Sequence, residues 1–288
     1  MKMTQKVKSK SKVPGNTAQV ATIMKYTLLD YVRSRRFFII LSITLAISVI
    51  LTVLVGHYRP SSFLASNLSF YNSWWGDTAT YVIVLSGIFF GGDAISGEFQ
   101  NKTGYFTLPN PVRRSSIYIG KWLAAFTASA VILVIFTGIT VGNGLAYFSS
   151  VPYQFGESFL FAVLYLVAVL GFTFFFSSLF KSSSMSILVT AILFLFAFTL
   201  IQTLVSDLVQ TEPWFLITYG ADIIGNVLTT TYPAHITKTT GFGGGSNSNG
   251  LTITTYNATV PEGLAILAVY FIITAIVGLI LFERKEFN

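Results

Sequence analysis

The sequence predicts an all-α protein that crosses a membrane six times. Hydrophobic residues make up 53% of its 288 residues and charged residues only 10%, whereas about a quarter of the residues in an average soluble domain are charged. The apolar residues form long uncharged runs, and about 20 such residues suffice for a helix to cross the hydrocarbon core of a bilayer. The expected spans are, in chain order, about 37–56, 74–92, 117–141, 158–180, 184–206 and 263–282.

The distribution of basic residues predicts the orientation of these spans. With the N-terminus in the cytoplasm, all but two of the 18 Lys and Arg residues fall in cytoplasmic segments, and the two outside are Arg59 and Lys238. Membrane proteins show this excess of bases on the cytoplasmic side. It also explains the formal net charge of +7 through contact with anionic membrane lipids, without a nucleic-acid partner. The sequence thus predicts a multi-pass protein of the cell membrane with both termini in the cytoplasm.

The segment before the first span predicts a basic tail and a helix. Residues 1–16 are rich in Lys and Ser and contain Pro14-Gly15, which is typical of a disordered cytoplasmic tail. Residues 17–36 carry an apolar stripe beside several bases, as in an amphipathic helix that lies in the membrane interface. The alternative is a cytoplasmic extension of the first span. Residues 17–288 are expected to form a single transmembrane domain.

The second apolar run is the shortest, and its helix is expected to begin near Trp74. That start places Asp77 at the outer interface, where Trp75 and Tyr81 would belong to the belt of interfacial aromatic residues. The span would then end at residue 92, just before a polar loop.

The extracellular side is expected to hold one large loop, residues 207–262. Its apolar first part, 212–228, is expected to dip into the bilayer edge or to cap the bundle. The flanks of the glycine-rich stretch 241–250 alternate as in a small β-hairpin. Asn67 and Asn257 head N-x-S/T sequons on this side and are candidate glycosylation sites.

Several kinds of activity lack the residues that they require. No charged residue falls deep inside a predicted span, whereas ion-coupled carriers hold their ion near the membrane midplane. The two histidines, His57 and His235, both fall outside the bilayer, so they provide no Ser–His pair for intramembrane hydrolysis, and two lone histidines predict no metal site. A phosphate-binding loop is absent, because Gly120-Lys121 is followed by Trp122 and the first glycine of that motif is missing. We therefore expect no enzyme activity and no cofactor in this chain, so energy for transport must come from another polypeptide.

The cytoplasmic loop between the second and third spans, residues 91–121, is the most patterned polar segment of the chain. A short helix is expected from Ser96 to Phe106, with Glu98 in its first turn, where a carboxylate favours the positive helix end. Pro109 and Pro111 end this helix. Because such a helix bridges the mouths of two spans, a force applied to it would move both spans together. An ordinary cytoplasmic loop has no need of the acidic residue or of the two prolines.

The order of residues in this loop carries a family resemblance. The run Ile95-Ser96-Gly97-Glu98, followed by Lys102-Thr103-Gly104, Leu108, Pro111-Val112-Arg113-Arg114 and Gly120-Lys121, resembles the signature of ABC-2 type permeases. These are the membrane subunits of type V ABC exporters, and the resemblance is closest to the group associated with multicopper-enzyme maturation. The chain departs from the pattern in having Thr103-Gly104 in place of Gly-Thr and Arg113 in place of a serine. The in-plane helix, the six spans and the long last outer loop extend the resemblance over nearly the whole chain.

The resemblance implies a permease paired with a separate ATPase, assembled as two permease subunits and two ATPase subunits. ATP and Mg²⁺ would be bound by the ATPase, and the second permease would be a copy of this chain or a paralogue. The loop helix would be a coupling helix seated in a cleft of the ATPase. The residues implied in coupling are Ser96, Gly97, Glu98, Phe99, Lys102, Thr103 and Phe106. Anchoring at the membrane interface is expected of Arg113, Arg114 and Lys121.

Two functions remain open from the sequence. The first is an exporter that moves a hydrophobic or amphiphilic substrate out of the cell, powered by the separate ATPase. The second is an integral scaffold without transport activity that presents residues 207–262 to an extracellular partner. The coupling helix favours the exporter, because a scaffold has no use for it. A secondary carrier is disfavoured by the missing buried charges.

Overall fold

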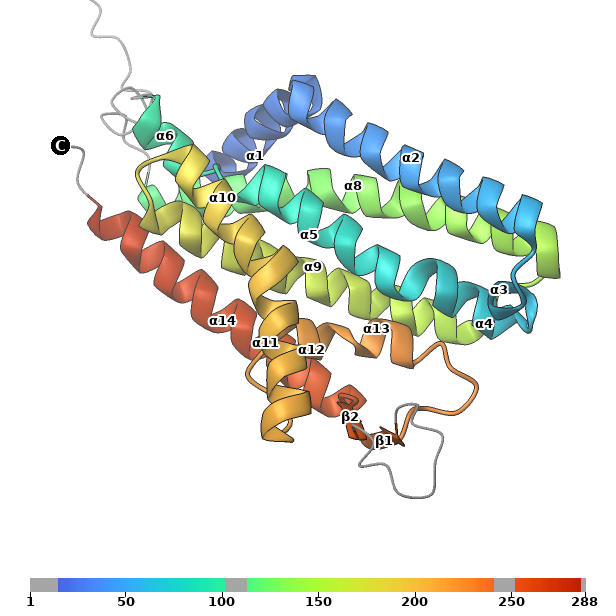
Figure 1. The fold of residues 1–288 in the computed structure, drawn as a ribbon. Helices are drawn as coiled ribbons and strands as arrows, with labels where there is room; N and C mark the ends of the chain where they lie inside the picture. Colours follow the sequence, from blue (N-terminus) through green and yellow to red (C-terminus); the bar gives the residue numbers. More distant parts are fainter. Residues whose placement is uncertain (1–14, 102–112, 241–251, 286–288) are drawn as a thin grey trace, which may run out of the picture.

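The computed structural model describes residues 15–101, 113–240 and 252–285. Within these residues, six helical segments are long and apolar enough to cross a membrane, which confirms the predicted all-α polytopic fold. Most of them run side by side along one axis, and the fifth crosses the others at an angle (Figure 1). The six segments are Arg35–Tyr58, Asn67–Gln100, Arg114–Phe148, Tyr153–Leu179, Ser183–Val209 and Val260–Arg284.

Each membrane segment is longer than the uncharged run that predicts it, because the helices continue into polar residues at their ends. α8 (Arg114–Phe148) also continues past residue 141, where the predicted span ends. The glycines that follow do not end the helix. At Gly144 the missing side chain leaves room for another helix, because a Cβ atom there would collide with the hydroxyl group of Tyr71.

The segment before the first span is a separate helix, α1 (Asn16–Arg33), joined to α2 (Arg35–Tyr58) at Ser34. The predicted range 17–36 therefore crosses a break. Ser34 has an extended backbone, and its hydroxyl oxygen accepts a hydrogen bond from the backbone N–H of Phe37, so it caps α2. α1 packs along the start of α8, where Gly120 permits close approach of the two helices.

The second membrane segment begins earlier than predicted. A short helix, α3 (Ser61–Leu64), follows α2, and the segment then starts with α4 (Asn67–Tyr71). The hydroxyl group of Ser66 caps α4. The chain continues through a π-helical turn, η1 (Asn72–Gly76), into α5 (Asp77–Gly91).

The prediction that Trp75 belongs to the interfacial belt is wrong. Trp75 is fully buried and stacks on Phe136 of α8, with ring centroids 5.6 Å apart. Its indole N–H donates a hydrogen bond to Ser158 Oγ (3.0 Å). A buried indole needs such a partner, and these contacts fix η1 against α8 and α9 (Tyr153–Leu179). Tyr81, the other expected belt residue, is exposed.

The fifth membrane segment is a rod built from alternating α-helical and π-helical parts. Its parts are α10 (Ser183–Ile192), η2 (Leu193–Ala197), α11 (Phe198–Leu204) and η3 (Val205–Val209). The rod ends at Gln210, whose backbone is left-handed (φ 51°). It packs mainly through α10, against α9 and α5.

Two short helices, α12 (Ile217–Ala221) and α13 (Ile223–Asn226), follow the rod. α12 packs on α14 (Val260–Arg284), and α13 packs on α9 and η1. Their apolar side chains are inaccessible to solvent and form part of the core: Ile217, Tyr219, Ile223 and Ile224. The apolar first part of the predicted outer loop is therefore packed into the bundle.

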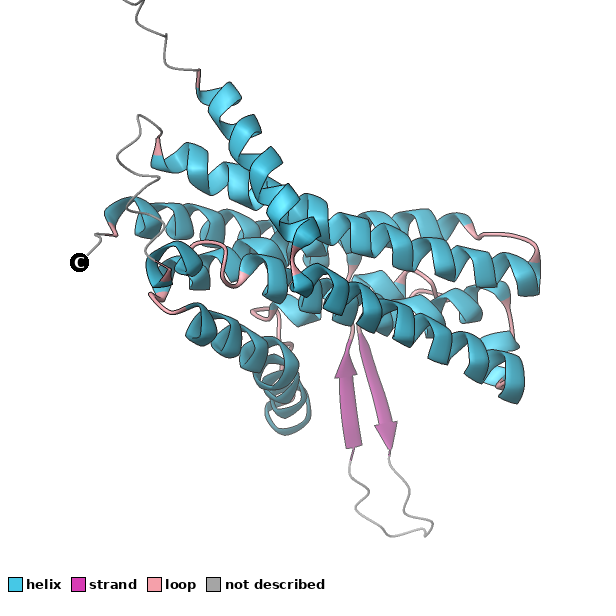
Figure 2. Ribbon diagram, turned by 90° about the horizontal axis from the view of Figure 1, so that it is seen from above, coloured by secondary structure: helices cyan, strands magenta, loops and turns pink. Residues whose placement is uncertain are grey.

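A β-hairpin completes the segment before α14, as predicted. Its strands are β1 (Ile236–Thr240) and β2 (Thr252–Tyr256), which are antiparallel with Ile236 opposite Tyr256. The hairpin projects away from the helices (Figure 2). The glycine-rich stretch 241–250 lies outside the described residues, as do residues 1–14 of the predicted tail.

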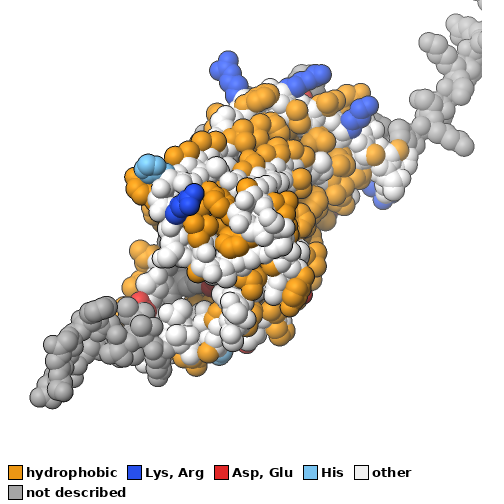
Figure 3. Space-filling model, turned by 90° about the vertical axis from the view of Figure 1, so that its right-hand side faces the viewer, with side chains coloured by type: hydrophobic (Ala, Val, Ile, Leu, Met, Phe, Trp, Pro, Cys, Tyr) orange, Lys and Arg blue, Asp and Glu red, His pale blue; other side chains and the backbone are white. Residues whose placement is uncertain are grey.

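The two ends of the bundle differ in charge. α1, α6 (Ser96–Gln100), the start of α8 and the end of α14 lie at one end (Figure 1). We call it the basic end, because Arg36, Arg114, Lys121 and Lys285 lie there. The opposite end, with α3, α4 and the β-hairpin, is the hairpin end. Seen from this end, apolar side chains cover much of the surface (Figure 3).

Candidate coupling region and polar cavity

The turn from α5 into α6 is held by a serine of another helix. Oγ of Ser177, in α9, accepts hydrogen bonds from the backbone N–H groups of Ile95 (2.9 Å) and Ser96 (3.0 Å). Ser96 and Ser177 are both fully buried. The first N–H groups of a helix have no partner within the helix, and α6 has no side-chain cap from its own N-terminal residue. Ser177 supplies that cap and joins α6 to α9.

Glu98 joins α6 to α8 through an ion pair. Its Oε1 lies 2.5 Å from Nζ of Lys121, which also donates a hydrogen bond to the carbonyl oxygen of Ala94 (2.8 Å). The side chains of Glu98 and Lys121 are 18% and 14% exposed. An ion pair this far removed from water is stronger than a surface pair, and breaking it leaves a poorly solvated charge.

Two further contacts join α6 to α10 and α14. Oε1 of Gln100 accepts a hydrogen bond from the backbone N–H of Ser183 (2.6 Å), at the start of α10. The ring of Phe99 lies edge-on to Phe282 of α14, with centroids 6.4 Å apart. Nζ of Lys285 lies 4.3 Å from the centroid of the Phe99 ring, within the range of cation–π attraction. α6 therefore contacts α8, α9, α10 and α14.

Lys285 also binds the end of α9. Its Nζ donates hydrogen bonds to the carbonyl oxygens of Ser178 (2.8 Å) and Phe180 (2.7 Å). Burial, together with the nearby charge of Lys181, lowers the pKa of Lys285 to about 8. The ammonium group occupies a favourable position, because carbonyl groups at a helix C-terminus lack partners within the helix.

α1 and α2 contact the residues that lead from α5 into α6. Arg36 forms an ion pair with Asp93, in the turn that leads to α6. The hydroxyl group of Tyr31 donates a hydrogen bond to the carbonyl oxygen of Phe90 (2.8 Å). Burial raises the pKa of Tyr31 well above its ordinary value, and the Asp93 charge adds to the effect, so this donor stays protonated.

The structure reassigns two of the three predicted interface anchors. Lys121 forms the ion pair with Glu98. Nη1 of Arg114 donates hydrogen bonds to the carbonyl oxygens of Glu283 (2.7 Å) and Lys285 (2.9 Å) at the end of α14. Both cations therefore bind the protein itself. Arg113 is exposed, and contact with lipid headgroups stays a prediction for this residue.

Of the helix predicted over Ser96 to Phe106, the structure describes residues up to Asn101, and α6 covers Ser96–Gln100. The first residues of α6 face the bundle. Ser96 is buried, whereas Asn101 at the end of α6 is exposed. The half-buried members of the predicted set are Gly97, Glu98 and Phe99. Three of the predicted coupling residues lie outside the described residues: Lys102, Thr103 and Phe106.

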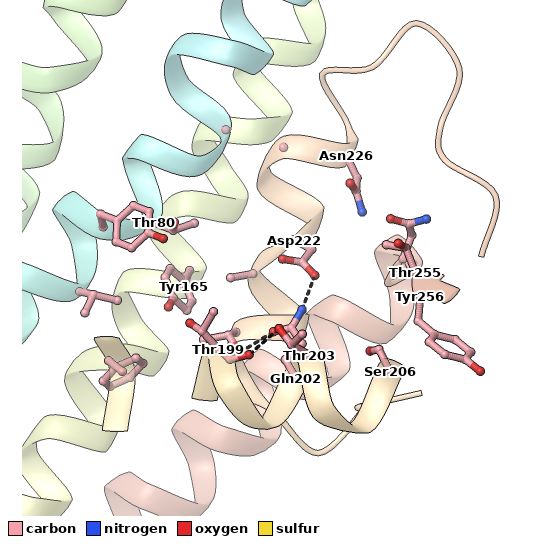
Figure 4. A pocket seen from close by; sticks show the side chains of 18 of the residues that line it. Thr80, Tyr165, Thr199, Gln202, Thr203, Ser206, Asp222, Asn226, Thr255 and Tyr256 are labelled. Atoms are coloured by element: carbon pink, nitrogen blue, oxygen red, sulfur yellow. Dashed lines mark hydrogen bonds between the residues drawn. The ribbon is translucent and has the colours of Figure 1, made fainter. Parts of the chain in front are cut away.

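A second candidate site is a cavity of about 680 Å³ beside the β-hairpin. Its walls come from α5, α9, the fifth-segment rod, the two short helices after it and β2. Figure 4 shows the polar side chains of these elements turned toward a shared space. Nε2 of Gln202 donates a hydrogen bond to Oδ2 of Asp222 (3.1 Å), and Oγ1 of Thr218 donates to Oε1 of Gln202 (2.9 Å). A cavity with polar walls inside an apolar bundle is a candidate binding site.

The irregular turns of the membrane helices meet at this cavity. Each π-helical turn in the described part of the chain contributes lining residues. π-Helical turns are rare and are frequent at functional sites. The residues concerned are Asn72 and Gly76 of η1, Phe194 and Leu195 of η2, and Ser206 and Asp207 of η3.

A pattern in the sequence marks one wall of the cavity. Thr199, Gln202, Thr203 and Ser206 recur at the i, i+3, i+4, i+7 spacing of one helix face in an otherwise apolar span. All four line the cavity. Asp222 gives no such signal, because it reaches the cavity only through the packing of the short helices that follow the rod.

Glu212, His235 and Glu262 form a small ionisable group at the hairpin end. Their ligand atoms lie within 4.8 Å of one another, so these residues could hold a metal ion. Nε2 of His235 lies 3.3 Å from a carboxylate oxygen of Glu212, and its Nδ1 lies 3.9 Å from one of Glu262. Nδ1 also lies 3.1 Å from the carbonyl oxygen of Asn257, which is its nearer partner. The sequence predicts no metal site, because two lone histidines are more often surface residues than metal ligands.

Both candidate glycosylation sites use their amide nitrogens within the protein. Nδ2 of Asn67 donates a hydrogen bond to the carbonyl oxygen of Ser150 (3.2 Å), and Nδ2 of Asn257 donates to that of Ala234 (2.8 Å). Glycosylation would join a sugar to this nitrogen and would change these contacts. The modification stays a prediction.

Comparison with known families agrees with the resemblance in the loop. A family model described as "ABC-2 family transporter protein" matches residues 21–287. The match includes α6, the helices that it contacts and the residues that line the cavity. No curated protein matches the chain.

Proposed function

We propose that this chain, which belongs to the ABC-2 transporter family and is a permease subunit of an ABC transporter, exports a hydrophobic or amphiphilic substrate. In this proposal a separate ATPase, with its own ATP and Mg²⁺, supplies the energy. Two copies of the ATPase work with two permease subunits, and the basic end of the bundle lies in the cytoplasm. Permeases of this family generally work with an ATPase partner.

The observation that carries the proposal is the attachment of α6 to several membrane helices at once. The Ser177 hydroxyl, the Glu98–Lys121 ion pair and the Gln100–Ser183 hydrogen bond each lead to a different helix. A partner that moves α6 therefore moves the inner ends of these helices together. Packed protein interiors are stiff and transmit such displacements, so the movement can reach the hairpin end.

The cavity provides a place for the polar part of an amphiphile on the outward path. α5 and α9, which meet at the coupling region, also form cavity walls. Next to the cavity, the rod exposes large apolar side chains such as Phe196 and Leu200. A substrate can thus place its polar head in the cavity while its tail remains in the hydrocarbon of the membrane.

Two measurements test the proposed function. Purification of the solubilised protein from its native membrane should recover an ATPase subunit. Inside-out vesicles that contain the complex should then take up a fluorescent amphiphile only when ATP is present. Because the substrate is unknown, three amphiphiles with the same tail and a neutral, a cationic or an anionic head are used as probes.

ATP-dependent uptake of at least one probe supports export. A complex without an ATPase contradicts the proposal, as does a vesicle assay in which ATP drives the probes outward. A variant of the ATPase that binds but does not hydrolyse ATP is the control for passive leakage.

A further inference from the structure

We infer that the cavity binds the cationic head of the exported amphiphile, with the carboxylate of Asp222 as its counter-ion. This inference rests on the proposed export function and specifies the chemical class of its substrate. It follows from the charges that line the cavity, from the way Asp222 is held and from the aromatic rings beside it.

The charged residues of the cavity are all acidic. Asp207 and Asp222 line it, whereas none of the lining residues in the described part of the chain is Lys, Arg or His. Both carboxylates are half-buried, and a charge that is partly shielded from water interacts more strongly with nearby charges than one in bulk water. A cationic ligand in the cavity is therefore attracted, and an anionic ligand of the same shape is repelled by both carboxylates.

Asp222 is oriented by a neutral relay. Thr218 donates a hydrogen bond to the amide oxygen of Gln202, whose amide nitrogen in turn donates to Oδ2 of Asp222 (Figure 4). An amide donor fixes the position of the carboxylate without neutralising its charge. The relay joins α11, α12 and the start of α13, so the counter-ion is positioned by rigid elements of the fold.

Aromatic side chains complete the environment that a lipophilic cation prefers. The rings of Tyr81 in α5, Tyr165 in α9 and Phe194 in η2 line the cavity. The faces of such rings attract cations, most strongly where water is excluded. Val84 and Leu195 add apolar surface for the groups attached to the charge.

Binding of two ions with the same shape and opposite charge tests this inference. The purified full-length permease in zwitterionic nanodiscs is titrated with tetraphenylphosphonium and with tetraphenylborate, and empty nanodiscs provide the correction for partitioning into lipid. We expect saturable binding of the phosphonium, with no saturable binding of the borate. Asp222→Asn should weaken phosphonium binding by roughly tenfold or more, as expected when one close opposite charge is removed.

Two matched variants separate the charge of Asp222 from its structural role. Asp222→Glu keeps the carboxylate and should retain most of the binding, even if the relay is disturbed. Glu157→Gln removes an exposed carboxylate of α9 that lies near the same end but does not line the cavity, and it should bind the phosphonium as the unchanged protein does.

Equal binding of the two ions would overturn the inference, as would unchanged phosphonium binding in Asp222→Asn. An equal loss of phosphonium affinity in Glu157→Gln would also overturn it. The loss would then come from the overall negative charge of the protein and not from a binding site at Asp222. The titration needs neither ATP nor the ATPase. If it fails, the vesicle assay still tests the export function independently. Conversely, vesicles without ATP-driven uptake would remove the export function while saturable phosphonium binding would still identify a cation site.

Discussion

A chain that carries Glu98→Lys is expected to lose ATP-driven transport, roughly tenfold or more, while it still inserts into the membrane. The substitution replaces an ion pair of 2.5 Å by two cations that face each other at the start of α8. A charge-assisted hydrogen bond contributes about 1.5–3 kcal/mol, which is enough to release α6 from α8 in a large fraction of molecules. The measurement is ATP-dependent uptake into inside-out vesicles, with the membrane content of the protein as the reference.

The charge-swapped chain is the control for this result. Glu98→Lys combined with Lys121→Glu restores opposite charges at the same two positions, and transport should recover substantially. Normal transport in the single variant would contradict the role given to the pair. A double variant as inactive as the single one would show that Glu98 acts on a partner and not through Lys121.

Ser177→Ala is expected to lower the stability of the protein and its transport together. The substitution removes the shared acceptor of two buried backbone N–H groups, those of Ile95 and Ser96. Each unsatisfied buried donor costs about 1–3 kcal/mol, so losing the acceptor of two donors should lower the free energy of unfolding by about 2–6 kcal/mol. Thermal unfolding of the detergent-solubilised protein measures this loss, and ATP-driven uptake measures the effect on coupling.

Ser178→Ala provides a control at the adjacent position. The hydroxyl group of Ser178 is also buried, but it has no hydrogen-bond partner in the part of the chain that the structure describes. Its removal should therefore be neutral or slightly stabilising. A similar loss of stability in both variants would mean that the hydrogen bonds from Ser177 to the start of α6 do not account for the effect.

The membrane helices could be predicted from the sequence because their apolar runs are long and uninterrupted. The limits of the helices could not, since capping and packing decide them. Ser66 starts the second segment well before the uncharged run, and Gly144 lies inside α8 because it packs against Tyr71. The sequence places Trp75 at the interface because aromatic residues commonly lie there, but its neighbours Phe136 and Ser158 make it a core residue.

The candidate sites were predictable to different degrees. The loop motif singled out Glu98, yet it gave no indication that Lys121 would be its partner, because that pairing depends on how α6 folds back against α8. Ser177 lies in an apolar run, where a serine can as easily bond its own helix. The cavity depends on tertiary contacts between distant segments. Among its lining residues, only the helix face formed by Thr199, Gln202, Thr203 and Ser206 leaves a pattern in the sequence.

The central claim is that a nucleotide-hydrolysing partner acts on this permease at α6, and site-specific cross-linking tests it most directly. The chain contains no cysteine, so Asn101→Cys introduces a unique thiol at the exposed end of α6, and Ser62→Cys introduces one on exposed α3 at the hairpin end. In the assembled transporter, the thiol at position 101 should cross-link to the ATPase and resist a membrane-impermeant maleimide added to intact cells. The thiol at position 62 should show the opposite behaviour. Labelling of position 101 from outside the cell, without a cross-link to any ATPase, would contradict the account.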